Sequence, residues 1–305
     1  MYDIGIIGGG TAGLTAAIYA QRAGKQTVIL EAMSYGGQIT ATHKIENYPG
    51  IESISGGEFA EGLMSQAKKL GADMKSEKVM KVREERDHKV IETEGNLYEC
   101  KAVILATGVT HRRLGVQRET QLIGAGVSYC ATCDGAFFRG RNVAVIGGGN
   151  TALQDVSFLS NYCKKVYLVH RRKEFRGEQH LVELLKEKEN VEFVLDATVK
   201  ELIGEEYIEG VVLNRVGTDE TMELQVDGVF VAIGHVPQND VFEDIVKLDG
   251  SGFILAAEDC QTSCPGIFAA GDCRTKEVRQ LTTAAADGAV AAIAGCNYLD
   301  RMDAR

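Results

Sequence analysis

The chain carries one strand, glycine turn, helix and strand pattern twice, and this internal repeat restricts the fold more than any other feature. The first copy is "YDIGIIGGGTAGLTAAIYAQRAGKQTVILE", with an expected strand over Asp3–Ile7 and an expected helix from about Leu14 to Ala23. The second copy is "NVAVIGGGNTALQDVSFLSNYCKKVYLVHRR". Each copy is followed later by an apolar strand that runs into a glycine, "KAVILATGV" and "DGVFVAIGHVP". The repeat therefore predicts an α/β protein with two Rossmann-like, doubly wound dinucleotide-binding domains.

The C-terminal segment, from about Phe242, belongs to neither copy. It contains "GIFAAGDC", an expected strand ending on Asp272, and an alanine-rich helix expected from about Thr282 to Tyr298. The simplest arrangement returns this segment to the first domain. Residues 1–114 and 244–305 are then a discontinuous domain, and residues 115–243 are a domain inserted into it.

The first glycine turn fits the G-x-G-x-x-G pattern through Gly8, Gly10 and Gly13, which allow the backbone to approach a pyrophosphate at a helix N-terminus. Glu31 follows the turn at about 20 residues, where a carboxylate binds a ribose hydroxyl. FAD suits this site because it stays bound and relays a hydride from a nicotinamide to a disulfide. Asp272 is expected to bond the flavin's ribityl or phosphate region, or else to be a plain turn aspartate. A tight turn without a ligand is the alternative for the glycines.

The second glycine turn has Gly147 and Gly149, with Ala152 at the third position. At the distance where the first copy has Glu31, this copy has a basic cluster: His170, Arg171, Arg172 and Arg176. Arginine forks bind phosphates well, so the expected ligand is the 2′-phosphate of NADPH. The alternative is a solvated basic strand end.

The stretch "SYCATCDGAFF" places Cys130 and Cys133 two residues apart with Asp134 directly behind them. Zinc would need a second cysteine pair, for which only Cys260 and Cys264 have roughly suitable spacing. A structural disulfide is the other alternative. The favoured interpretation is a redox-active pair, with Asp134 as the acid that protonates a departing thiolate or as a helix N-cap. Gly135 is expected to leave room for an approaching ring.

Charge, the apolar pattern and cysteine usage argue against a nucleic-acid partner, a membrane span and export. The net charge of −10 argues against a nucleic acid. The apolar stretch between Asp3 and Arg22 is interrupted by glycines and follows no basic region, so neither a signal peptide nor a membrane span is expected. Without an export signal, the eight cysteines are expected to be reduced thiols in the cytoplasm, with the Cys130–Cys133 pair as the exception.

Taken together, these motifs resemble the bacterial-type, low-molecular-weight NADPH-dependent thioredoxin reductases from end to end. "CATCDG" is the most specific match, supported by "GGQI", "ENYPG", "HRRKEFR" and "RQLTTAAADG". Thr11 stands where the family usually has proline, and Ala286 where many relatives have glycine.

The resemblance implies a homodimer that passes electrons from NADPH through FAD and the Cys130–Cys133 disulfide to thioredoxin. Alternatives are a related reductase serving another small redox protein, an NAD(P)H oxidase, and a non-catalytic redox-sensing module. The implied FAD contacts are Gly8, Gly10, Thr11, Ala12, Gly13, Glu31, Gly37, Gln38, Asn47, Ala106, Thr107, Gly108, Gly271, Asp272, Arg279 and Gln280. The implied NADPH contacts are Gly147, Gly149, Asn150, Thr151, His170, Arg171, Arg172 and Arg176.

Overall fold

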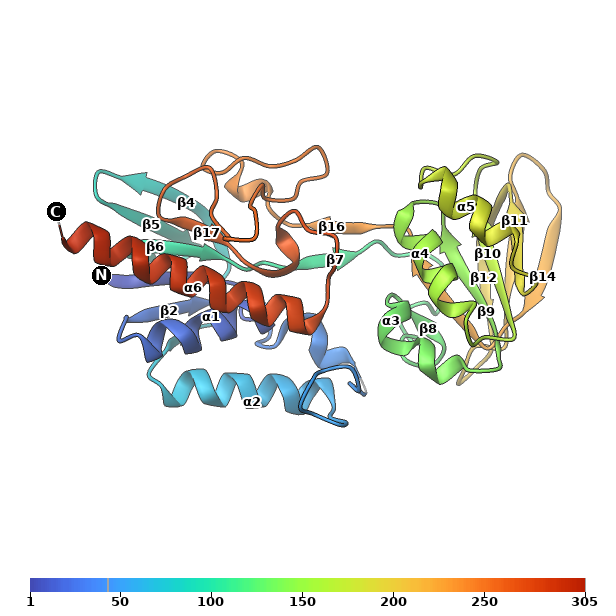
Figure 1. Ribbon diagram of the computed structural model, residues 1–305, viewed down its shortest axis with the longest axis horizontal. Coiled ribbons are helices and arrows are strands. Elements are labelled where there is room, and N and C mark those ends of the chain that lie inside the picture. Colours follow the sequence, from blue (N-terminus) through green and yellow to red (C-terminus); the bar gives the residue numbers. More distant parts are fainter. Residues whose placement is uncertain (43, 305) are drawn as a thin grey trace. The chain divides into compact units, whose positions relative to one another are not determined.

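The computed structural model describes residues 1–42 and 44–304 and divides the chain into two compact units. Unit 1 comprises Met1–Thr110 and Val236–Arg305, and unit 2 comprises His111–His235 (Figure 1). Unit 2 is therefore an insertion in the chain of unit 1. The boundaries expected from the sequence, 114/115 and 243/244, lie slightly further along the chain at both crossings.

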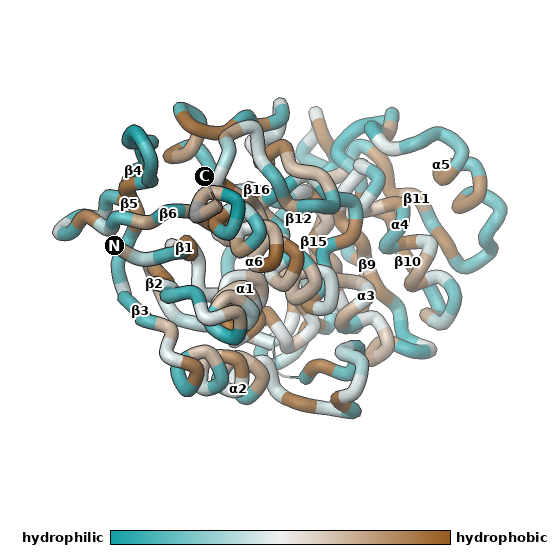
Figure 2. The backbone as a smooth tube through the Cα atoms, turned by 60° about the vertical axis from the view of Figure 1, so that its left-hand side comes forward, coloured by the Kyte–Doolittle hydropathy of each residue, from teal (hydrophilic) through white to brown (hydrophobic). Residues whose placement is uncertain are grey.

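A sheet of order β3-β2-β1-β6-β5-β4 is the centre of unit 1. Its parallel strands are β1 (Tyr2–Ile7), β2 (Thr27–Leu30), β3 (Asp73–Lys75), β6 (Leu97–Leu105) and β17 (Ile267–Ala269), which pairs with β6. The antiparallel strands are β4 (Val79–Glu85) and β5 (His88–Thr93). The charged tip of this hairpin is strongly hydrophilic in Figure 2.

Alternate side chains of these strands enter two separate cores. Ile4 and Ile6 of β1 pack with helices α1 (Thr11–Arg22) and α6 (Leu281–Asp303), whereas Val28 of β2 packs with Phe242 and neighbouring apolar residues. Helix α2 (Gly56–Lys69) begins at a Ser55–Glu58 capping box, which satisfies its first backbone N–H groups. Short 3-10 helices η1 (Gly37–Ala41), η3 (Asp240–Phe242) and η4 (Gly271–Cys273) lie in the loops.

Unit 2 repeats the same plan. Its parallel sheet has the order β11-β10-β9-β15-β8. The strands are β8 (Val127–Ser128), β9 (Asn142–Gly147), β10 (Lys165–His170), β11 (Val191–Leu195) and β15 (Gly228–Ala232). The helical segments are α3 (Ala131–Asp134), η2 (Gly135–Phe138), α4 (Asn150–Leu159) and α5 (Gln179–Lys186). An antiparallel sheet of β12 (Ala197–Ile203), β13 (Gly210–Arg215) and β14 (Thr221–Gln225) completes the unit.

The predicted repeat is confirmed strand by strand. β1 lies between β2 and β6, and β9 lies between β10 and β15. The strands of the two later apolar segments, β6 and β15, therefore occupy equivalent positions in the two sheets, each next to the strand that leads into a glycine turn. Each unit thus has the parallel sheet of a Rossmann-like domain, as predicted. One strand end was predicted wrongly: β17 stops at Ala269, and Gly271 (φ +79°) then turns the chain so that Asp272 lies in η4.

The two crossings between the units run side by side. Strands β7 (Val109–His111) and β16 (His235–Pro237) pair as a two-stranded ribbon. At one step Thr110 Oγ1 donates to Val236 O at 3.1 Å, and at the next Arg112 N donates to Gly234 O at 3.0 Å. Among the described helices, none combines the length and apolar character that a membrane crossing requires.

Candidate cofactor and disulfide sites

The first glycine turn is built by close backbone contacts. A Cβ atom at Gly8 would lie 2.3 Å from Ala106 O, and one at Gly13 would lie 1.9 Å from Gly8 O. Gly8 also has φ +107°, which favours glycine. A Cβ atom at Gly10 would meet only Gly36 O, at 3.9 Å, among the surrounding described atoms, so the turn leaves open space at the start of α1.

The N-terminus of α1 has no acidic residue in its first turn and no side-chain cap at Gly10. Unpaired N–H groups at such an end attract an anion such as a pyrophosphate. Glu31 lies beside this turn and accepts hydrogen bonds from Gly9 N (2.7 Å) and Met33 N (2.8 Å). Its carboxylate is therefore fixed next to the turn, as a ribose-binding group requires.

Asp272 follows Gly271, where a Cβ atom would lie 2.9 Å from Ala12 Cβ in the first turn of α1. Within the described chain, Asp272 Oδ1 is buried without a hydrogen-bond partner. Burial raises the pKa of Asp272, although Lys276 and Arg279 oppose the shift. A buried polar atom without a partner usually marks a ligand, a water or a functional site.

Two further predicted flavin contacts meet at the N-terminus of α6. Asn47 Nδ2 donates to Gln280 Oε1 at 3.2 Å, and Gln280 is the N-cap of α6. Arg279 donates to Asp272 O at 3.3 Å, and its guanidinium lies 4.4 Å from the ring centroid of Phe253. Asn47 and Gln280, two predicted contacts that are distant in sequence, are thus joined by a direct hydrogen bond.

The remaining predicted contacts of unit 1 surround the turn. Gly10 and Gly36 form a β-bridge next to Gly37, and Gln38 Nε2 donates to Val109 O. Thr107 Oγ1 donates to Asn239 Oδ1 at 2.9 Å. Asn239 was not predicted: it is fully buried and its Nδ2 donates to Cys273 O at 2.9 Å, which links "ATG" to η4.

Together, the glycine turn, the Glu31 carboxylate and the unpaired oxygen of Asp272 fit a dinucleotide that spans α1 and α6. The fit rests on open space at a helix N-terminus and on one orphaned buried acceptor, both in unit 1.

The second glycine turn has a similar geometry. A Cβ atom at Gly147 would lie 2.3 Å from Ala232 O, whereas one at Gly149 would meet none of the surrounding described atoms within 4 Å. Asn150 begins α4 and binds the end of the loop between β10 and α5, because its Oδ1 accepts from Glu178 N (2.7 Å) and its Nδ2 donates to Glu178 Oε1 (3.1 Å). Thr151, in the first turn of α4, is exposed.

His170 and the arginines of the predicted phosphate site differ in environment. His170 is 8% exposed, its ring fills the space beneath Gly148, and it stacks on Phe175 with ring centroids 5.0 Å apart. Burial lowers the pKa of His170, and the nearby arginines lower it further. His170 therefore supports the turn as a neutral ring and does not add to the positive charge of the arginines.

The arginines of this cluster, by contrast, are exposed: Arg171, Arg172 and Arg176. The loop that carries them is fixed to the glycine turn, because Arg176 N donates to Gly148 O at 2.8 Å. Exposed guanidinium groups next to a glycine turn suit an anionic ligand.

The cysteine pair forms a disulfide. Cys130 and Cys133 are joined by an S–S bond of 2.08 Å with Cα atoms 5.3 Å apart. Cys130 precedes the single turn of α3 and is half-buried, whereas Cys133 within that turn is exposed. A disulfide leaves no thiolate to bind zinc, and within the described residues no group of three or more His, Cys, Asp or Glu is arranged to hold a metal.

Asp134 lies directly behind the disulfide and is fixed by Ser128. The Ser128 hydroxyl donates to Asp134 Oδ2 at 2.6 Å, and Cys130 N donates to Ser128 Oγ at 3.0 Å. Ser128 therefore links the carboxylate to the backbone of the first cysteine, a role the sequence did not predict. Asp134 precedes η2 without a side-chain capping bond.

The prediction that Gly135 leaves room for an approaching ring is wrong. A Cβ atom there would lie 2.3 Å from the Tyr162 hydroxyl and 2.8 Å from Leu159, so the missing side chain is needed for packing against α4. Phe138 also packs inward, with its ring centroid 5.2 Å from that of Phe230, while Phe137 is exposed.

A ring stack at the crossings adjoins the cysteine pair. Tyr129, next to Cys130, stacks on His111 with ring centroids 4.8 Å apart, and His235 lies 4.9 Å from His111. Burial, and then the neighbouring His235, lowers the pKa of His111 to about 4. The six remaining cysteines are free thiols, as expected, and all of them are buried: Cys100, Cys163, Cys260, Cys264, Cys273 and Cys296.

Comparison with known proteins defines the class. Residues 2–288 match the family described as pyridine nucleotide-disulphide oxidoreductase, and the chain belongs to this family. A thioredoxin reductase of Treponema pallidum is 41% identical over 302 residues, covering 99% of this chain and 98% of that protein. A 34.2 kDa protein in the rubredoxin operon of Clostridium pasteurianum is 40% identical over 298 residues, covering 97% of each chain.

A solved structure agrees with these relatives. The thioredoxin reductase from Streptococcus pyogenes superimposes with a TM-score of 0.94 at 40% identity, covering 99% of each chain. The resemblance to bacterial-type thioredoxin reductases, drawn from the sequence motifs, is confirmed.

Proposed function

We propose that this protein is an NADPH-dependent thioredoxin-disulfide reductase, with FAD bound by unit 1 and NADPH bound by unit 2. The observation that carries the proposal is the Cys130–Cys133 disulfide, exposed at Cys133, on the same unit as a glycine turn flanked by exposed arginines. The names of the relatives support the same activity. FAD, when bound, accepts a hydride from NADPH and delivers two electrons to a disulfide.

In unit 1, the residues that would hold FAD are those around the first glycine turn, Glu31, Asp272 and the N-terminus of α6. The open space at Gly10 admits a pyrophosphate, and Asp272 Oδ1 has acceptor capacity for a hydroxyl of the ligand. In unit 2, Arg171, Arg172 and Arg176 bind the 2′-phosphate, and Gly149 with Asn150 and Thr151 binds the pyrophosphate.

The cysteine pair carries the exchange with the protein substrate. Two electrons and two protons convert the disulfide into two thiols. One thiolate attacks the disulfide of thioredoxin and forms a mixed disulfide, and the other then attacks that bond, which restores Cys130–Cys133 and releases reduced thioredoxin. Asp134, hydrogen-bonded to Ser128, supplies a proton to the departing thiolate.

An anaerobic NADPH titration of the purified FAD-loaded protein tests the proposal. We expect two new thiols, mapped to Cys130 and Cys133, and turnover when thioredoxin is added. Absence of new thiols at these positions would overturn it. Turnover with another small redox protein but not with thioredoxin would favour the related reductase.

The proposal extends to assembly and location. A homodimer follows from the family resemblance, and sedimentation of the purified protein tests it. The six free cysteines support a reducing compartment such as the cytoplasm.

A further inference from the structure

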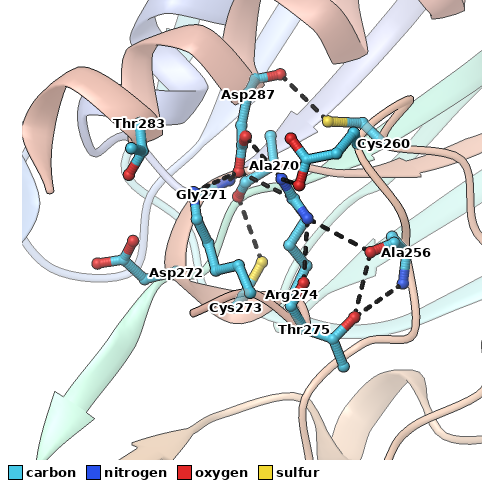
Figure 3. Close-up of polar contacts among 12 residues, drawn as sticks. Ala256, Cys260, Ala270, Gly271, Asp272, Cys273, Arg274, Thr275, Thr283 and Asp287 are labelled. Carbon is cyan, nitrogen blue, oxygen red and sulfur yellow. Dashed lines mark hydrogen bonds and ion pairs between the residues drawn. The ribbon is translucent and has the colours of Figure 1, made fainter. Parts of the chain in front are cut away.

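A buried ionic cluster lies directly behind Asp272. Asp287 of α6 is 6% exposed and Arg274 is 2% exposed. Asp287 Oδ2 accepts hydrogen bonds from Gly271 N, Arg274 Nε and Lys276 Nζ, each at 2.9 Å, and Oδ1 accepts from Arg274 Nη2 at 2.9 Å (Figure 3). The carboxylate thus accepts four hydrogen bonds, three of them at Oδ2.

Stability alone is a poor explanation of this cluster. Burying an ion pair costs about as much desolvation energy as the pair returns, and apolar side chains of similar volume often hold two segments equally well. The charges do something an apolar pair cannot: they bind backbone groups. Arg274 donates to Ala256 O and Thr275 O, and Asp287 accepts from the N–H of Gly271, the first residue of η4.

The cluster also adjoins the first glycine turn. A Cβ atom at Gly271 would lie 2.9 Å from Ala12 Cβ, and one at Gly288, the neighbour of Asp287, would lie 2.2 Å from Ala12 O. Ala12 is in the first turn of α1. A movement of Asp287 is therefore transmitted both to the turn that carries Asp272 and to the helix end at the glycine turn.

Asp272 itself points away from the cluster. Its carboxylate lies on the side of η4 opposite to Arg274 and toward the beginning of α6, where Thr283 is drawn (Figure 3). Burial would raise the pKa of Asp287, but the hydrogen bonds from Arg274 and Lys276 outweigh this effect and lower it. Asp287 is thus an anion at neutral pH and Asp272 is left for another ligand.

We propose that Asp287 is a positioning residue for FAD: by holding the N–H of Gly271 with a charge fixed by Arg274 and Lys276, it sets where Asp272 meets the flavin dinucleotide. The inference rests on the proposed FAD site in unit 1. It assigns to the cluster a role in cofactor affinity that goes beyond joining α6 to the sheet.

The test compares FAD binding with the stability of the apoprotein. Asp287→Asn keeps the shape but replaces one acceptor oxygen by a donor that faces buried cations. We expect its FAD dissociation constant, measured by quenching of flavin fluorescence, to rise about tenfold or more, with a changed visible circular dichroism of the bound flavin. The matched control is Lys89→Gln, which removes another buried cation of unit 1, Lys89, whose ion-pair partner Glu84 is exposed.

If Asp287→Asn does not fold, Lys276→Gln replaces it, because this change removes one donor and leaves Arg274 and the Gly271 bond in place; a rise of about threefold is expected. The inference is overturned if the variant lowers the melting temperature of the apoprotein as Lys89→Gln does while FAD affinity and the flavin spectrum stay as in the original protein. Failure of the original protein to bind FAD would instead refute the proposed function, and the inference with it.

Discussion

Removing two arginines from the second glycine turn should separate NADPH from NADH. Arg171 and Arg176 are exposed, so solvent screens their charges and each phosphate contact contributes at the lower end of the range for hydrogen bonds to charged groups, roughly tenfold in affinity. If the two contributions add, Arg171→Ala with Arg176→Ala should raise the KM for NADPH roughly 100-fold. NADH lacks the 2′-phosphate, so its KM should change less than about twofold.

The assay is initial-rate reduction of thioredoxin with each nucleotide at varied concentration. Lys173→Ala is the matched control, because Lys173 is an exposed cation of the same loop that was not assigned to the phosphate. The backbone of the loop should survive the substitutions, since Arg176 is fixed to Gly148 through its main-chain N–H. Equal increases in KM for NADPH and NADH, or an equal effect of Lys173→Ala, would refute the assignment of these arginines.

Three further perturbations follow from the geometry. Cys133→Ser should lower thioredoxin reduction by at least about a thousandfold, while NADPH still bleaches the flavin. The control Cys163→Ser changes a buried free cysteine and should keep turnover. If Cys133→Ser oxidised NADPH as fast as the original protein, an NAD(P)H oxidase would be favoured. Gly13→Ala should abolish FAD binding, because its Cβ would lie 1.9 Å from Gly8 O. The control is Gly57→Ala on α2, where the new Cβ would meet none of the surrounding described atoms within 4 Å, and this variant should fold and bind FAD normally. FAD retention by Gly13→Ala would contradict the turn geometry. The pKa of His111 is about 4 in the folded chain and 6.5 ordinarily, so the unfolded state binds more protons between these values and the free energy of unfolding should fall as pH decreases from 6.5 to 4. His111→Gln should show a smaller decrease in denaturant titrations over this range, and an unchanged slope would count against burial of His111.

Local patterns predicted those features that depend on neighbouring residues. The glycine turns follow from spacing, because Gly8 and Gly13 meet within one strand-to-helix turn. The Cys130–Cys133 pair is likewise close in sequence, and its disulfide was anticipated as a redox pair. Glu31 was found because the second strand of a Rossmann unit ends at a regular distance from its first turn.

Features that depend on distant segments were missed. Asn239 links Thr107 to Cys273 across long stretches of chain, and no short motif marks such a residue. His170 has the right position for a phosphate ligand, but packing beneath Gly148 makes it a support. Burial of that kind is decided by the fold and not by residue type.

The paired strands β7 and β16 bring both ends of the insertion together, with Thr110 and Val236 in hydrogen-bond contact. Because the two chain ends of unit 1 are adjacent at the insertion point, unit 1 can keep the same backbone path when a different domain is inserted there. Unit 2, which carries the second glycine turn and the Cys130–Cys133 disulfide, can thus be exchanged as one module without redesign of the backbone of unit 1.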